Sequence, residues 1–309
     1  MGRLIEDYVL LSRGIGIKSG VSLMLPRVLN KFGIRYPESV VVDKFIKENF
    51  QDVLGKYTRV EVNISEPIKK VIWCFWWQGV NNMPPTITVC YNQLLRNANG
   101  REVILLSENN YKDYVNLPPK ILEKFDSGII GFSHFSDIIR VTLLKEYGGL
   151  WIDAAIFATK PIEIPKLSFY TPILSIEPKD TPHLNLWVIG CMAAAPKHPF
   201  FSYLYDLLVE YWSKFNVAYT YLFFDYFIRY GYEHFSWIKK MISECPLESP
   251  DFFCRYLFKE EVDYERLEHI LANNNFISLT YRIDYPRVSK RGKETYYSAL
   301  LKKYNYPIV

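Results

Sequence analysis

The stretch from residue 69 to residue 157 alternates between apolar runs and amphipathic segments. Two apolar runs, Val71 to Trp77 and Glu102 to Leu106, are separated by Thr86 to Ala98, which has the apolar spacing of a helix. A second helix-like segment, Pro118 to Phe125, follows them. This alternation is typical of β-α-β units, in which helices join parallel strands. The stretch therefore predicts an α/β fold with a mostly parallel sheet.

A longer helix and a buried strand are predicted next. Residues 133–147 have apolar side chains at helical spacing, Ser133 is the expected N-cap, and Gly148 with Gly149 marks the end. Residues 150–157 form an apolar run that predicts one continuous central strand. The helix and the strand thus follow each other without a linker.

Residues 1–60 have a different pattern. Short amphipathic stretches at 4–11, 21–32 and 42–54 predict several short helices that form an accessory layer. Basic and apolar residues alternate here, which suits either contact with an anionic membrane surface or a solvated layer packed on the main domain. The expected helix breakers are Gly14, Gly16, Gly20, Pro26 and Pro37.

The second half of the chain predicts two strands, at 169–176 and 186–195, and two aromatic-rich helices, at 199–214 and 219–230. The C-terminal tail has no clear pattern. No repeat, low-complexity tract or flexible linker divides the chain. We therefore predict one continuous domain at 61–309 behind the accessory segment.

Composition and charge exclude several classes of protein. Apolar residues make up 49% of the 309 residues, enough for a substantial core. The formal net charge is only +4 and the basic residues are scattered, so we expect no nucleic-acid partner. Five cysteines without a CxxC pair predict neither a disulfide framework nor a thiolate metal site. No apolar run approaches the roughly 18 to 20 residues of a membrane helix, and Glu6 and Asp7 interrupt a signal-peptide core, which predicts a cytoplasmic protein.

Three charged residues stand out between residues 132 and 161. Asp137 and Arg140 are three apart and share one face of the predicted helix, which leaves the other face for packing. Asp153 lies near the end of an apolar strand, where a carboxylate is costly to bury unless it meets a cation or several donors. A divalent metal that carries a diphosphate is one such partner, and ligands of open α/β sheets bind at the carboxyl ends of strands. Taken singly these residues suit a surface pair and a strand-end cap, but together they favour a nucleotide site.

The sequence resembles the DxD-motif sugar transferases of glycosyltransferase family 32, and more closely the bacterial capsular polysaccharide synthesis proteins among them. The resemblance covers roughly residues 66–215. The combination of S-D-x-x-R with G-G-x-[WY]-x-D at this spacing is specific. The matching segments are P-I-K-K-V-I-W-C-F-W-W-Q-G (67–79), E-V-I-L-L-S-E-N-N-Y-K-D-Y-V-N-L-P (102–118), S-D-I-I-R (136–140), Y-G-G-L-W-I-D (147–153) and A-A-A-P-K-H-P-F (193–200).

The resemblance implies a GT-A fold, which is a Rossmann-like glycosyltransferase fold, with an N-terminal helical extension. Residues 61–160 would be the nucleotide-sugar-binding half, and residues 161–309 the acceptor-binding half with a closing segment. The implied reaction is transfer of a hexose or N-acetylhexosamine from a UDP-sugar, with retention of configuration, to a capsule or O-antigen glycan of a bacterial surface. A lipid-linked oligosaccharide acceptor would place the protein at the inner face of the plasma membrane, with peripheral membrane association.

The resemblance also implies the residues that bind the donor. Trp76 would stack on the nucleotide base, with Trp77 as the alternative, because a tryptophan face gains stacking energy without demanding hydrogen-bond geometry. Trp73 is expected to belong to the core. Asp137 would hold sugar hydroxyls, and Arg140 would bind hydroxyl or phosphate oxygens. The motif neighbours included in the donor site are Ser136, Trp151 and Ile152.

Asp153 matches the first aspartate of the DxD motif, and with Mn²⁺ or Mg²⁺ it would bridge ribose and diphosphate. It is expected to be catalytic together with Asp137 and Arg140. Ala155 replaces the second aspartate of the motif, so one direct metal ligand is missing and the mode of metal binding stays open. The two phosphates, waters and a group from the C-terminal segment are the remaining candidate ligands.

The stretch 277–293 has the polar and basic groups that a loop closing over a diphosphate would need, although a solvated basic tail has the same composition. The residues assigned to this loop are Thr280, Tyr281, Arg282 and Lys290.

Two other functions remain in view. The Ala155 replacement suits a degenerate transferase that serves as a glycan-binding or scaffold subunit of a polysaccharide synthesis complex, but the intact motif residues argue against it. A nucleotidyl or phosphoryl transferase would need a Gly-rich phosphate loop or paired metal carboxylates, and the sequence has neither. No nucleophile or base is identified, and Asp137, Glu177 and Asp180 are the available carboxylates.

Overall fold

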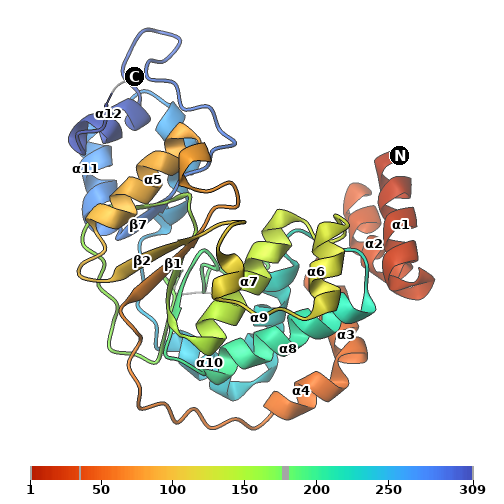
Figure 1. The fold of residues 1–309 in the computed structure, drawn as a ribbon. Coiled ribbons are helices and arrows are strands. Elements are labelled where there is room, and N and C mark those ends of the chain that lie inside the picture. The colour runs from red at the N-terminus through yellow and green to blue at the C-terminus, as the bar shows by residue number, and fades with distance from the viewer. Residues whose placement is uncertain (1, 35, 176–180, 308–309) are drawn as a thin grey trace.

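The computed structural model describes residues 2–34, 36–175 and 181–307 (Figure 1). Glu177 and Asp180, two of the available carboxylates, lie outside the described residues, as does the end of the strand predicted at 169–176.

A five-stranded sheet forms the centre of the molecule, in the order β2-β1-β3-β6-β5. The strand β1 (Val71–Phe75) pairs in parallel with β2 (Glu102–Leu106) on one side and β3 (Gly149–Ile152) on the other. The strand β6 (Cys191–Ala194) pairs antiparallel with β3 and with the short β5 (Phe169–Tyr170). The predicted α/β class is confirmed, and β6 is the strand of this sheet that runs opposite to the other four.

Helices connect the parallel strands as the alternation of apolar runs predicts. The helix α5 (Pro85–Arg96) joins β1 to β2, while α6 (Pro119–Asp126) and α7 (Phe132–Glu146) join β2 to β3. The helix α8 (Pro199–Lys214) has the predicted bounds and packs along α7 (Figure 1). The predicted N-cap is wrong, because α7 begins one residue before Ser133 and its N-cap position is Gly131.

The prediction of one strand at 150–157 is wrong. The chain leaves the central sheet after Ile152, turns through residues 153–155, and enters β4 (Ile156–Ala158), which pairs antiparallel with β7 (Phe276–Ser278) in a second sheet. The amide of Asp153 donates to the carbonyl of Gly190 (2.8 Å), and the amide of Ile156 donates to the carbonyl of Asp153 (2.9 Å). Asp153 therefore lies in a turn between two sheets, where a side chain can face a cavity.

The other predicted elements of the second half are shorter or shifted. The strand candidates at 169–176 and 186–195 contribute only β5 and β6, because turns take up most of residues 181–190. The helix predicted at 219–230 is α9 (Phe223–His234). The elements after α9 are α10 (Ser236–Ser243), η3 (Pro250–Lys259), α11 (Tyr264–Asn273) and α12 (Tyr296–Lys303). Two short 3-10 turns lie in the first half of the chain, η1 (Val80–Asn82) and η2 (Tyr111–Asp113).

Four helices precede the sheet, which confirms the N-terminal helical extension. They are α1 (Gly2–Ile15), α2 (Ile17–Lys31), α3 (Glu38–Asn49) and α4 (Gln51–Tyr57). Buried residues of α3 and α4, such as Phe45 and Leu54, belong to the same hydrophobic cluster as buried residues of α8 and α9. The α1–α2 pair lies at the opposite end of the molecule from α11 and α12 (Figure 1). The division of residues 61–309 into a donor half and an acceptor half stays a prediction.

Two of the expected helix breakers lie inside α2. Gly16 does separate α1 from α2, with a φ of 88° that favours glycine. Gly20 instead allows close packing of the two helices, because a Cβ there would lie 2.9 Å from the backbone nitrogen of Ser12. Pro26 is also helical, so the break predicted there is wrong, although a proline removes one helical hydrogen bond.

Candidate active site

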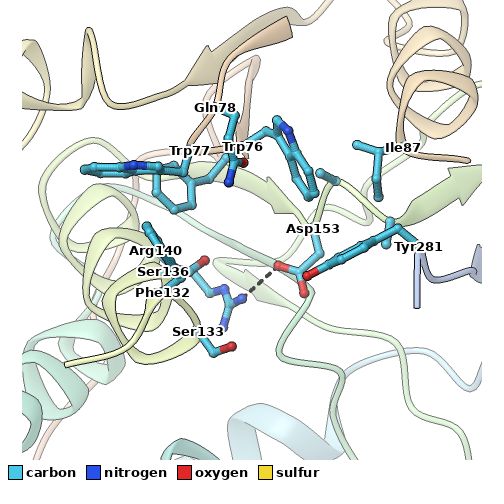
Figure 2. Close-up of a pocket in the computed structure, with 13 residues that line it drawn as sticks. Trp76, Trp77, Gln78, Ile87, Phe132, Ser133, Ser136, Arg140, Asp153 and Tyr281 are labelled. Atoms are coloured by element: carbon cyan, nitrogen blue, oxygen red, sulfur yellow. Dashed lines mark hydrogen bonds and ion pairs between the residues drawn. The ribbon is translucent and has the colours of Figure 1, made fainter. Parts of the chain in front are cut away.

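Three charged side chains from two elements meet at the end of β3. Arg140 lies on α7 and donates from Nη1 to Oδ1 of Asp137 (2.7 Å). It also donates from Nη2 to Oδ1 of Asp153 (2.8 Å), and Figure 2 shows this second bond. The Arg140 and Asp137 side chains are buried, whereas the Asp153 side chain is 41% exposed. The structure thus brings together the three residues predicted to be catalytic, with the guanidinium between two carboxylates.

Aromatic rings enclose the Arg140 guanidinium. Its Cζ lies 4.9 Å from the ring centre of Trp151 and 5.8 Å from that of Phe224. Burial opposes the charge of Arg140, but the carboxylates of Asp153 and Asp137 more than compensate and raise its pKa. Its Nε is buried without a hydrogen-bond partner among the residues that the structure describes. The part of α7 that contains Asp137 and Arg140 is buried as well, and its predicted role in binding a ligand stays a prediction.

Asp153 has one occupied and one available carboxylate oxygen. Its Oδ1 accepts from Arg140 and also from the indole Nε1 of Trp151 (2.7 Å), so Trp151 orients the carboxylate rather than lining the cavity. Its Oδ2 lies beside Gly190, where a Cβ would come within 2.6 Å of that oxygen. Glycine at this position leaves the second oxygen free to meet a ligand.

An oxygen of this kind suits Mg²⁺ or Mn²⁺, which bind through one or two carboxylates when substrate phosphates and waters complete the shell. Ala155 offers no ligand atom. Among the described residues, the group that has three metal-type ligands within reach of one another is Asp43, Glu233 and His234, on the outer side of α3 and α9. If a metal binds at this site, Asp153 is the side chain that would hold it, and the other ligands would come from the substrate.

A cavity of about 260 Å³ opens beside Asp153 and contains most of the predicted donor-binding residues. Trp76 and Tyr281 form one wall, with their ring centres 5.4 Å apart and nearly perpendicular, and Ser136 lies on the opposite wall (Figure 2). Trp77 also lines the cavity, but it packs against Phe125 and other rings of the core. The wall formed by Trp76 is thus the better placed for stacking.

The remaining predicted residues lie at or outside the edge of this cavity. Trp73 is 3% exposed and donates to the carbonyl of Gly148 (2.8 Å), which confirms that it belongs to the core. Ile152 is buried in β3 and does not line the cavity. Arg282 is exposed, with its guanidinium 5.8 Å from the ring centre of Tyr281. Lys290 is exposed and lines neither this cavity nor the next.

A second cavity of about 350 Å³ lies on the other side of Asp153 and Ala155, which line both. It contains Asp225, a residue of α9 that is 2% exposed and accepts a hydrogen bond from Nε1 of Trp187 (2.9 Å). Sequence reasoning missed Asp225, because it lies in the run F-F-D-Y-F, whose aromatic residues indicate core packing. An acid within such a run is itself a signal, since carboxylates are rarely buried without a partner.

Burial raises the pKa of the Asp225 carboxyl to about 7. The bond from Trp187 and the charge of Arg140 oppose this shift, and the charge of Asp137 adds to it. The folded state therefore binds an extra proton between about pH 4 and pH 7, so this carboxyl costs stability as the pH rises through that window.

Asp225→Asn is accordingly expected to raise the free energy of unfolding at pH 8, by an amount on the order of a few kcal/mol, and to change it little at pH 4.5. Urea unfolding of both proteins at the two pH values measures this difference. Asp126→Asn, at an exposed position of α6, is the matched control and should show no pH-dependent change. An equal effect of Asp225→Asn at both pH values would contradict the account.

The chain is similar to known proteins over most of its length. A family model described as capsular polysaccharide synthesis protein matches residues 25–300. The O-glycosyltransferase braB of Annulohypoxylon truncatum is 29% identical over 162 residues, and the match covers 47% of this chain and 38% of that protein. The O-glycosyltransferase PaGT of Phomopsis amygdali is 28% identical over 140 residues, and the match covers 40% of this chain and 34% of that protein.

The chain therefore spans less than two fifths of the length of these two curated relatives. Among solved structures, the PaToxG glycosyltransferase has a TM-score of 0.41 at 16% sequence identity, and the match covers 63% of this chain and 78% of that one.

Proposed function

Because the chain belongs to the family of capsular polysaccharide synthesis proteins, we propose that it is a glycosyltransferase that moves a hexose or N-acetylhexosamine from a UDP-sugar to a hydroxyl of a glycan acceptor. The observation that carries this proposal is the Arg140 guanidinium held between Asp137 and Asp153. Arg140 lines the first cavity, and Asp153 lines both. The names of the two curated relatives, both O-glycosyltransferases, support transfer to an oxygen.

The first cavity has the character of a nucleotide site. The aromatic wall of Trp76 offers a face for the uracil base, and Ser133 and Ser136 on α7 offer hydroxyls for the polar groups of the donor. Asp153 lies at the inner end of the same cavity, where a base stacked on Trp76 would direct its diphosphate.

A divalent metal at Oδ2 of Asp153 would supply positive charge for the departing diphosphate. The chain's own part is to fix that oxygen, and it does so through Arg140 and Trp151, which both donate to Oδ1. Arg140 also places a permanent positive charge next to the reacting bond. We propose retention of the anomeric configuration, in keeping with the family that the motifs resemble.

Trp76→Ala is expected to weaken binding of UDP about 10-fold or more, because base–aromatic stacking contributes about 1 to 3 kcal/mol per base. Isothermal titration calorimetry with UDP, in the presence of Mn²⁺, measures the change. Leu95→Ala, at an exposed position of α5, is the control. Unchanged UDP affinity in Trp76→Ala would exclude this wall as the base site, and absence of UDP binding to the wild type would contradict the proposed donor.

The acceptor that we propose is a lipid-linked oligosaccharide of a surface polysaccharide such as capsule or O-antigen, met at the inner face of the bacterial membrane. No helix of the described residues is long and apolar enough to cross a membrane. Contact through α2 is proposed instead, because apolar residues three or four apart form an exposed row along this helix. These residues are Ile17, Val21, Leu25, Val28 and Phe32, with exposed fractions of 69, 51, 43, 37 and 76%.

The charge of the N-terminal segment supports membrane contact through α2. Residues 1–35 contain six basic and two acidic side chains, and their net charge of +4 equals that of the whole chain. A basic segment with an exposed apolar row is suited to a bilayer that contains anionic lipids.

The double variant Val21→Asp/Phe32→Asp is expected to abolish co-sedimentation with vesicles that contain phosphatidylglycerol, because it places two charges in the apolar row. Val288→Asp, at an exposed position between β7 and α12, should bind vesicles as the wild type does. Equal vesicle binding by the double variant and the wild type would exclude α2 as the contact.

A further inference from the structure

The second cavity continues the first one past the diphosphate end of the proposed donor site. Asp153 and Ala155 line both cavities, so a molecule that spans the boundary has one part on each side of Asp153. If the nucleotide lies against Trp76, the part beyond the diphosphate enters the second cavity. That part is a sugar, either the one being transferred or the one that receives it.

The lining of the second cavity suits a saccharide. Phe252 and Phe253 provide aromatic surface for the apolar faces of a sugar ring, while Arg255 and His183, which lie against Phe253, provide polar groups. Asp225 lies on α9 and is the carboxylate of this cavity besides Asp153, among the described residues.

One oxygen of the Asp225 carboxylate accepts a hydrogen bond, and among the described residues the other accepts none. Nε1 of Trp187 donates to its Oδ1 (2.9 Å), and among the described residues no donor binds its Oδ2. Trp187 is itself 1% exposed and lines the cavity, so the indole fixes the carboxylate from within the core. A buried carboxylate with a single donor is costly, and a ligand hydroxyl would satisfy the remaining oxygen.

We propose that the second cavity is a sugar subsite in which Asp225 accepts a hydrogen bond from a hydroxyl of the bound saccharide, while Trp187 positions the carboxylate. This inference rests on the proposed function. The hydrogen bond to Asp225 is the same whether the saccharide is the transferred sugar or the terminal sugar of the acceptor. Binding experiments can distinguish these two ligands.

The test compares Asp225→Asn with the wild type. Asparagine can still accept the bond from Trp187, so the fold is retained, but the charge that strengthens a bond from a sugar hydroxyl is lost. Calorimetry with Mn²⁺ gives affinities for UDP, UDP-glucose, UDP-galactose and UDP-N-acetylglucosamine. Saturation-transfer NMR in the presence of UDP gives affinities for the methyl glycosides of the same three sugars.

Affinity for UDP should stay within about twofold of the wild-type value, whereas affinity for a sugar-bearing ligand should fall about 10-fold or more. A loss confined to a UDP-sugar assigns the subsite to the transferred sugar, and a loss confined to a methyl glycoside assigns it to the acceptor. Trp187→Phe, which removes the indole N–H, should give a smaller loss for the same ligand.

The inference is overturned if no sugar-bearing ligand binds more weakly to Asp225→Asn, or if affinity for UDP falls by the same factor as affinity for the UDP-sugars. Absence of UDP binding to the wild type would instead overturn the proposed function, and the inference with it. Asp126→Asn, at an exposed position on α6, serves as the control for the effect of removing a carboxylate.

Discussion

Asp153→Asn is expected to lower the rate of UDP-sugar turnover by about two to three orders of magnitude, the usual effect of removing one group that stabilises transition-state charge. Asparagine is nearly isosteric and can accept from Arg140 and Trp151, but its side chain is neutral and binds a divalent cation poorly. Because the Asp153 side chain is 41% exposed, the fold should be retained. Turnover is measured as UDP release, and stability is measured by urea unfolding.

Asp126→Asn is the matched control, since it removes an exposed carboxylate of α6 that lines neither cavity. Turnover by Asp153→Asn at the wild-type rate, with unchanged dependence on metal, would mean that Asp153 is not the metal ligand of this site.

Arg140→Met is expected to have the second large effect, on both stability and activity. It leaves the buried carboxylate of Asp137 without the guanidinium that lies 2.7 Å away, and loss of one partner of a buried ion pair costs about 3 to 5 kcal/mol. Asp153 and Asp225 also lose the nearby positive charge. Urea unfolding should show the reduced free energy of unfolding, and UDP release should be undetectable.

The double variant Asp137→Asn/Arg140→Met separates the two effects. It removes both charges of the buried pair, so part of the lost stability should return, while turnover should not. Recovery of turnover together with stability would show that Arg140 supports the fold alone and has no role in the reaction.

The fold could be predicted from the sequence wherever a local pattern determines the element. The helix α8 has the predicted bounds, because its apolar spacing and its N-terminal proline are both local signals. The strand predicted at 150–157 is divided, because the end of pairing with β6 depends on a hydrogen bond from Asp153 to Gly190, a contact distant in sequence. Pro26 lies within α2 although its sequence signal indicates a break.

In the candidate site, too, local sequence patterns predict some features, and contacts between distant residues determine the others. The positions of Asp137 and Arg140 on one helix face, and of Asp153 at a strand end, follow from motif spacing, because both are set by local geometry. Asp225 could not be placed from sequence, since its neighbours in the chain are core aromatics and its partner Trp187 is 38 residues away. A side chain that enters a site from a distant helix leaves no spacing pattern.

Ala155 in place of the second motif aspartate is the one feature that favours a scaffold over an enzyme. The structure supports an enzyme through Asp153, because Gly190 leaves its second oxygen free and two donors orient the first. A carboxylate that only stabilised the fold would not need one oxygen oriented by two donors and the other available to a ligand, at a position that lines two cavities.

The most direct test of the proposed function is release of UDP by the wild-type protein from UDP-glucose, UDP-galactose, UDP-N-acetylglucosamine and UDP-N-acetylgalactosamine, with Mn²⁺, with Mg²⁺ and with a chelator. The proposed function predicts turnover of one of these donors in the presence of metal, and no turnover with the chelator. Absence of both binding and turnover for every UDP-sugar would contradict it and would favour the scaffold function.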